Sequence, residues 1–382
     1  MNFGTLDCGT NPTPELTDKD IQKFLMEALE HKASDVHITV NLPPIMRVNG
    51  ELRCMRDYVL MPDQTRILCL ALMNDRQRDI VETVGEVDFS YVLPNVSRFR
   101  VNVYKQRKSY CAAIRVVTSE IPTLDSLGFP PILKEMTTRP RGLILVTGPT
   151  GSGKSTTLAA MVHHINTTRS CHILTLEEPI EYLHRHKRCM INQREVGDDS
   201  KSFASGLRSA LREDPDVILV GEMRDLETIS TAVSAAETGH LVMSTLHTTS
   251  AAQTIDRIID VFPPHQQQQI RIQLSTVLTG IISQQLLQTS DGQGRVAALE
   301  ILVANDAVRN LIREGKTYQI STVLQTHLKQ GMYTMDYSLA QLVKAGTISQ
   351  EMARMHCGDL ENLNRYLAQS RQSVSQSMHD MF

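Results

Sequence analysis

Gly148-Pro149-Thr150-Gly151-Ser152-Gly153-Lys154-Ser155 is the stretch of sequence that decides the fold. It fits the phosphate-binding pattern G-x-x-x-x-G-K-[ST] without a mismatch. The short apolar run at residues 144–146 predicts a buried strand before it, and apolar residues recur at helical spacing over 158–162 after it. A strand, a glycine-rich loop and a helix in this order predict a site where backbone N–H groups and the positive end of the helix dipole hold phosphate.

The chemistry of this loop predicts its ligands. In such loops the lysine reaches the β- and γ-phosphates and the serine or threonine hydroxyl holds Mg²⁺. We therefore expect ATP and Mg²⁺ as cofactors, with Ser155 as a magnesium ligand. The expected nucleotide-binding residues are Gly148, Pro149, Thr150, Gly151, Ser152, Gly153, Lys154, Ser155 and Thr156.

Length and composition indicate a globular protein of more than one domain. The chain has 382 residues, with 41% hydrophobic and 21% charged residues, and two domains are the first expectation at this length. The formal charge of −3 argues against nucleic acid as the main partner, which needs a concentrated positive face. Since no apolar run approaches the ~20 residues that cross a bilayer, we expect no transmembrane segment.

Cysteine usage indicates a reducing compartment. The seven cysteines are scattered and none forms a C-x-x-C pair, so we expect reduced thiols, a cytoplasmic location and no structural zinc. His184, His186 and Cys189 stand among basic residues that would repel a cation, so they predict a polar loop rather than a metal site.

Patterning along the chain predicts its domain boundaries. We expect a flexible arm over residues 1–16, a small α+β domain over 17–117 and a linker, rich in Pro and Gly, over 118–131. Residues 132–369 alternate between strand and helix patterns, which predicts an α/β domain with a parallel sheet and a helical C-terminal part. The remaining residues, 370–382, predict a disordered tail. Asn49-Gly50 is a hairpin signal in the first domain, and the strands expected in the second span 143–147, 172–176, 217–221 and 241–245.

Two further strands deliver carboxylates to the edge where the phosphate loop lies. Glu222 follows the apolar run 217–220, and ligands of open α/β sheets bind at this carboxyl edge. There it can orient a water toward the γ-phosphate and hold Mg²⁺ through water. Gly221 stands where many such enzymes have an Asp, so the metal must rely more on Ser155 and other acids. Glu177, Glu178 and Glu181 follow the strand at 172–176, and spacing does not decide which of them touches metal or water.

Histidines and arginines complete the candidate set. His240 and His247 bracket the strand at 241–245, and a His near the γ-phosphate can report its presence by hydrogen bonding. Arg98, Arg100 and Arg115 lie in strands of the first domain. Arginines in strands usually cover a solvent face, but Arg is also the residue that stabilises γ-phosphate charge from outside a site.

Together these motifs resemble the secretion-type ATPases that drive type IV pili and type II secretion, over about residues 17–365. The resemblance includes Ala33-Ser34-Asp35-Val36-His37, the acidic box at 174–182, the stretch at 213–225 and the His box. Ala307-Val308-Arg309-Asn310-Leu311-Ile312-Arg313-Glu314 is close to a motif typical of the members that retract pili. Glu178 departs from the family, which commonly has Asp there.

The resemblance implies a PAS-like N-terminal domain and a RecA-like P-loop ATPase domain, assembled as a homo-hexamer with ATP between the domains. It implies Glu222 as the catalytic glutamate, with catalytic roles for Glu181, His240 and His247. Arg100 and Arg115 best match the arginines that reach a neighbouring ATP, and Arg98 competes with Arg100. It also implies a cytoplasmic motor at the inner membrane that acts on a pilus platform protein and powers pilus retraction and twitching motility.

Three alternatives stay open at this point. A pilus extension or type II secretion ATPase usually carries a longer N-terminal region and a four-cysteine zinc site, and neither pattern is found here. A non-hydrolysing accessory ring subunit conflicts with intact Lys154 and Glu222. A RecA-like nucleic-acid motor conflicts with the weakly acidic balance of the chain.

Overall fold

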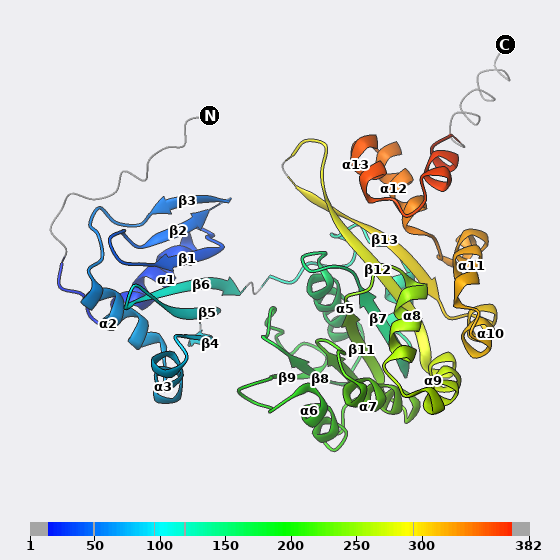
Figure 1. Ribbon diagram of the computed structural model, residues 1–382, viewed down its shortest axis with the longest axis horizontal. Helices are drawn as coiled ribbons and strands as arrows, with labels where there is room; N and C mark the ends of the chain where they lie inside the picture. Colours follow the sequence, from blue (N-terminus) through cyan, green and yellow to red (C-terminus); the bar gives the residue numbers. More distant parts are fainter. Residues whose placement is uncertain (1–13, 49, 95, 118–119, 293, 369–382) are drawn as a thin grey trace, which may run out of the picture. The chain divides into compact units, whose positions relative to one another are not determined.

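The computed structural model describes residues 14–48, 50–94, 96–117, 120–292 and 294–368. The chain divides into two compact units, one ending at Glu120 and the other beginning at Ile121, with the short segment Glu181–Leu183 grouped with the first. Figure 1 colours the first unit from blue to cyan and the second from cyan to red. Of the predicted arm only residues 14–16 are described, and the predicted tail lies outside the described residues.

The first unit is an antiparallel sheet of six strands in the order β3-β2-β1-β6-β5-β4. Its elements are α1 Asp20–Glu30, β1 Asp35–Ile38, β2 Ile45–Val48, β3 Glu51–Cys54, α2 Pro62–Leu72, α3 Asp75–Thr83, β4 Glu86–Leu93, β5 Ser97–Gln106 and β6 Ser109–Val117. On β5, Phe99, Val101 and Val103 are buried in one core with residues of α1 and α2, whereas Arg100 is exposed. Buried and exposed residues thus alternate along β5, as in a strand with one face on the core. The antiparallel sheet with helices packed on it confirms the α+β prediction.

The hairpin prediction lies partly outside the described residues. Strands β2 and β3 pair in antiparallel register from Ile45 opposite Cys54 to Val48 opposite Glu51. Gly50 sits between them at φ 87°, while Asn49 is outside the described residues.

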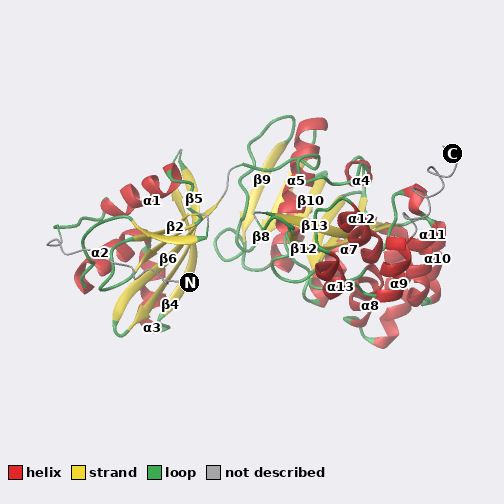
Figure 2. Cartoon of the chain, turned by 90° about the horizontal axis from the view of Figure 1, so that it is seen from above, coloured by secondary structure: helices red, strands yellow, loops and turns green. Residues whose placement is uncertain are grey.

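The second unit is built on a seven-stranded mixed sheet in the order β13-β12-β7-β11-β10-β8-β9. Its strands are β7 Gly142–Thr147, β8 His172–Glu177, β9 Met190–Glu195, β10 Val217–Val220, β11 Leu241–Leu246, β12 Leu278–Gln288 and β13 Arg295–Val303. Its α-helices are α4 Ile132–Thr137, α5 Lys154–Thr168, α6 Phe203–Ala210, α7 Leu226–Glu237, α8 Ala251–Asp260, α9 Pro264–Val277, α10 Asp306–Glu314, α11 Ile320–Thr326, α12 Met335–Lys344 and α13 Gln350–His356. Helices and strands of both units are distinguished by colour in Figure 2.

The central strands of the second unit are buried on both faces. Every residue of β7 and β11 is buried, as expected of parallel strands covered by helices on each side. On β7, Leu143 and Leu145 belong to a core shared with α7, α8 and α9, while Ile144 and Val146 belong to another shared with α4 and α5. Alternate residues of β7 thus belong to different cores on the two faces of the sheet, and the α/β prediction is confirmed.

The last part of the described chain packs in a third core of the second unit. Leu287 of β12 and Ala298 of β13 pack with Leu339 of α12, Ala353 of α13 and Tyr366. The two strands pair in antiparallel register from Gly280 opposite Val303 to Gln288 opposite Arg295. The helices α12 and α13 therefore rest on the β12–β13 pair.

The structure differs from the sequence prediction at three places. Strands β9, β12 and β13 are absent from the predicted set, because long-range pairing and not a strong local pattern makes them strands. The predicted linker is structured from Ile121 on, since Leu124 and Phe129 are buried in the core that contains α4 and α5. Among the residues that the structure describes, five cysteines are free but Cys54 is disulfide-bonded, so the expectation of reduced thiols throughout is wrong.

Among the described residues, no helix is both long and apolar enough to span a bilayer.

Candidate functional site

Four neighbouring strands bring the predicted site residues of the second unit to one edge of its sheet. Strand β7 pairs with β11, β11 with β10 and β10 with β8, all in parallel register. Their carboxyl ends therefore meet at the same edge. The phosphate loop follows β7, His247 follows β11, Glu222 follows β10 by one residue, and Glu177 ends β8.

The phosphate loop has a backbone that only glycine adopts without strain at three of its positions. Gly148 has φ 145°, Gly151 has φ 78°, and Gly153, the N-cap of α5, has φ 89°. A side chain at Gly148 would meet the carbonyl oxygen of Gln284 at 2.2 Å. The loop thus approaches β12 closely and then turns directly into α5, whose N-terminus faces the mouth of the loop.

Lys154 lies at the start of α5 with its ammonium group folded onto its own loop. Its Nζ donates to the carbonyl oxygens of Gly148 at 2.8 Å and Pro149 at 3.1 Å. The charge is therefore already held at the loop, and a phosphate group would compete with these carbonyl oxygens for it.

Glu222 has both carboxylate oxygens engaged. Nε2 of His247 lies 3.2 Å from Oε1, and a guanidinium N–H of Arg224 donates to Oε2 at 2.7 Å. Burial raises the pKa of Glu222, but the hydrogen bond from Arg224 and the neighbouring His247 outweigh it, so the pKa lies below its ordinary value. Glu222 is thus held as a carboxylate beside the predicted His247. Arg224 was not among the predicted site residues, although it stands two residues after Glu222 in the same motif.

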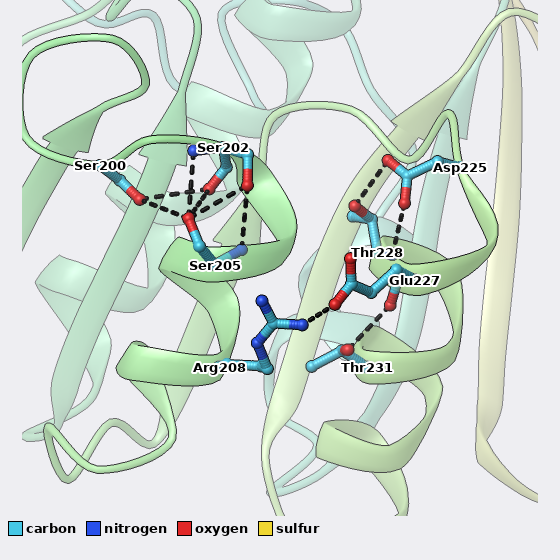
Figure 3. A network of polar contacts seen from close by, with 8 residues as sticks. All are labelled: Ser200, Ser202, Ser205, Arg208, Asp225, Glu227, Thr228 and Thr231. Carbon is cyan, nitrogen blue, oxygen red and sulfur yellow. Dashed lines mark hydrogen bonds and ion pairs between the residues drawn. The ribbon is translucent and has the colours of Figure 1, made fainter.

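Two capped helices fix the chain segment that carries Glu222. Asp225 caps α7 by accepting hydrogen bonds from N–H and Oγ1 of Thr228 at 2.8 and 2.9 Å. Ser202 caps α6 through the backbone N–H of Ser205 at 3.2 Å. An ion pair between Arg208 and Glu227 joins the two helices, and Figure 3 shows these side chains pointing toward each other. Glu222 thus lies three residues before Asp225, the N-cap whose hydrogen bonds fix the start of α7.

Side chains of β8 and β9 contact the residues of the acidic box. Oε1 of Glu177 accepts hydrogen bonds from Oγ1 of Thr175 at 2.6 Å and Nε2 of Gln193 at 3.0 Å. Glu195, buried at the end of β9, accepts from the backbone N–H of Ile180 at 3.1 Å. Glu178 is exposed, and Glu181 groups with the first unit, so its catalytic role stays a prediction.

His240 lies immediately before β11, as its position in the sequence predicts. Its carbonyl oxygen accepts from the N–H of Gly142, the first residue of β7. Its Nδ1 lies 2.9 Å from the carbonyl oxygen of Ala235. Six residues of strand, about 20 Å, separate it from the edge that carries the phosphate loop. The catalytic role that the family resemblance implies for His240 stays a prediction.

The arginines of the first unit form a row across its sheet. Arg100 of β5 lies directly opposite Arg115 of β6, and Arg115 lies opposite Asp35 of β1. Nε of Arg115 donates to Asp35 at 3.0 Å. Both Arg100 and Arg115 are exposed, whereas Arg98 is half-buried. The exposure suits a contact outside the unit, and the role of these arginines stays a prediction.

A cavity of about 1160 Å³ adjoins the phosphate loop. Its lining includes Gly153 and Thr156 of the loop and helix α5, Gln284 of β12, and Leu127 and Phe129 of the segment before α4. It has room for a nucleoside beside a phosphate site. A second, smaller cavity of about 280 Å³ lies at the amino edge of the sheet and is lined in part by Arg309.

Oxygen donors rather than a preformed cage are available for a metal. No group of three or more His, Cys, Asp or Glu side chains suited to a metal occurs in the described part of the chain. The Ser155 hydroxyl in the first turn of α5 and the carboxylate of Glu222 are the hard ligands that Mg²⁺ prefers beside phosphate oxygens.

The comparisons with known proteins agree with this arrangement. A family model described as type II/IV secretion system protein matches residues 13–354. The chain belongs to this family.

Particular members are similar over most of their length. A twitching motility protein of Neisseria gonorrhoeae is 53% identical over 321 residues, which cover 84% of this chain and 86% of the relative. The type IV pilus retraction ATPase PilT of Pseudomonas aeruginosa is 51% identical over 335 residues, covering 88% and 97%. A crystal structure of the pilus retraction motor PilT with bound ADP superposes with a TM-score of 0.85 at 50% identity, covering 92% of this chain and all of that one.

Proposed function

We infer that this chain is an ATP-hydrolysing motor subunit that powers type IV pilus retraction. The observation that carries the proposal is the convergence at one sheet edge of a phosphate loop, the paired Glu222 and His247, and the acidic box. Relatives at about half identity over most of the chain are named as twitching motility and pilus retraction proteins, which supports retraction as the output.

Each side chain of this edge has a part in hydrolysis. Lys154 leaves its loop carbonyl oxygens and binds the β- and γ-phosphates, and Glu222 orients and activates the attacking water. His247 lies 3.2 Å from Glu222 and fixes that carboxylate. Magnesium, when bound at Ser155, neutralises charge that develops on the phosphates. The adenosine moiety enters the adjoining cavity beside Phe129.

The ring and its partners extend the same proposal. A homo-hexamer places Arg100 and Arg115 of one subunit at the ATP of a neighbour, where an arginine stabilises the transition state. The motor works on the cytoplasmic side of the inner membrane against a pilus platform protein, and nucleotide turnover moves residues 17–117 relative to residues 132–369. The exposure of both arginines on one row of the first sheet supports this part.

The test separates binding from chemistry. Glu222→Gln should bind labelled ATP as the wild type does and hydrolyse it at least about a hundredfold more slowly, since an amide cannot accept the proton. Lys154→Ala should lose nucleotide binding because the phosphates lose their main point charge. Turnover of Glu222→Gln within about threefold of wild type, less than 1 kcal/mol of barrier, would remove Glu222 from the mechanism. Unchanged pilus retraction in cells that carry only this variant would remove the motor function.

A further inference from the structure

Gln284 lies directly behind the phosphate loop, 132 positions after its partner Ser152. Strand β12 runs parallel to β7, and Ser283 is opposite Thr147, the last residue of β7. Gln284 is therefore the first residue of β12 to extend past β7, beside the loop that follows it. Its side chain is buried, with 2% exposed.

The amide of Gln284 connects the phosphate loop to the first turn of α5. Its Nε2 donates to the carbonyl oxygen of Ser152 at 2.5 Å, and its Oε1 accepts from Oγ1 of Thr157 at 2.7 Å. These partners flank Lys154 and Ser155. Because a buried amide is stabilised only when its donor and acceptor are paired, this geometry fixes both partners at once.

The contact also fixes the direction of a backbone N–H group. In a trans peptide the C=O and the following N–H point in opposite directions. Since the carbonyl oxygen of Ser152 points at Gln284, the N–H of Gly153 points away from it. A side chain at Gly153 would come within 2.8 Å of Nε2 of Gln284, so the close approach requires glycine there.

We propose that Gln284 is a positioning residue for phosphate binding: it holds the peptide between Ser152 and Gly153 so that the N–H of Gly153 faces the phosphate. The inference rests on the proposed ATP-binding function of the loop. Gln284 acts through the loop backbone, so its contribution is larger in the affinity for phosphorylated ligands than in the affinity for the nucleoside, whose proposed cavity it also lines.

The next residue of β12 provides a matched control. Gln285 points to the other face, where its Oε1 lies 2.9 Å from Nδ1 of His356 at the end of α13. Replacing either glutamine by leucine removes an amide of the same size from the same strand. Only Gln284→Leu removes contacts with the phosphate loop.

The experiment compares ADP with adenosine, each competing against a fluorescent ATP analogue on the full-length protein. Gln284→Leu should weaken ADP binding by about tenfold or more and adenosine binding by a clearly smaller factor, whereas Gln285→Leu should change neither. Thermal melts check that each variant is folded. Unchanged ADP affinity in folded Gln284→Leu overturns the proposal, and so does an equal loss for ADP and adenosine, which indicates a general structural role.

A second variant covers the case in which Gln284→Leu does not fold. Thr157→Val keeps the shape of Thr157 and removes the hydrogen bonds from its Oγ1 to Oε1 of Gln284 at 2.7 Å and to the carbonyl oxygen of Gly153 at 3.2 Å. It should weaken ADP selectively, and the double variant should bind no worse than Gln284→Leu, because both changes break one network. ADP affinity equal to wild type in Thr157→Val overturns the proposal. If the wild type itself does not bind ADP and Lys154→Ala changes nothing, the proposed function fails, and not this inference alone.

Discussion

Replacing Gly148 by alanine tests whether the phosphate loop depends on its close approach to β12. The new methyl group would lie 2.2 Å from the carbonyl oxygen of Gln284 and 2.6 Å from Oγ of Ser152, where ordinary contacts are 3.4–4 Å. At φ 145° the backbone is also in a region that residues with a side chain rarely adopt. Both effects oppose the observed loop conformation.

The magnitude follows from adding the two effects. Backbone strain of this kind costs about 1–3 kcal/mol, and overpacking of a filled site costs about 1–3 kcal/mol. Together they disfavour the binding conformation by about 2–6 kcal/mol, so nucleotide affinity should fall at least about thirtyfold. Gly151→Ala is the matched control. Its methyl group would meet nothing within 4 Å at φ 78°, which leaves about 1 kcal/mol of strain and about a fivefold loss.

Titration of both variants with a fluorescent ADP analogue measures the difference, and circular dichroism checks that each is folded. Gly148→Ala should bind at least several-fold more weakly than Gly151→Ala. Equal affinities in the two variants would refute the steric reasoning, because they would show that contact with β12 has no effect on the loop.

Three further predictions follow from the same contacts. Arg224→Ala should raise the pKa of Glu222, because the hydrogen bond that lowers this pKa is lost. The carboxylate then becomes protonated at a higher pH, so kcat should begin to fall at a higher pH as the solution is made acidic. An unchanged profile of kcat against pH would contradict the role of the Arg224 contact. Asp225→Ala removes the α7 cap and should lower the free energy of unfolding by about 1 kcal/mol, a fall in Tm of about 2–4 °C; Thr231→Ala, which loses only a bond within the helix, should change Tm far less. Mixing Arg115→Ala chains with Glu222→Gln chains should partly restore ATP hydrolysis if the arginine acts on a neighbour, whereas no recovery in rings shown to be mixed would rule that out.

Much of the second unit could be predicted from sequence because its signals are local. The loop at 148–155 lies between a strand and a helix whose patterns are each contained in a few residues, and the four predicted strands are all present as β7, β8, β10 and β11. Glu222 and His247 could be placed because each directly follows or nearly follows such a strand. Strand direction also places His240, which precedes β11, at the opposite edge of the sheet.

Tertiary structure alone decided which distant residues complete the site. Strand β12 lies beside β7 because burial of apolar residues such as Ile281 and Ile282 selects that pairing, and this pairing places Gln284 against a loop far away in sequence. The core position of Phe129 likewise depends on packing with α4 and α5. A motif determines the chemistry of a short backbone segment, whereas the groups that hold it in place come from long-range pairing, which no local pattern encodes.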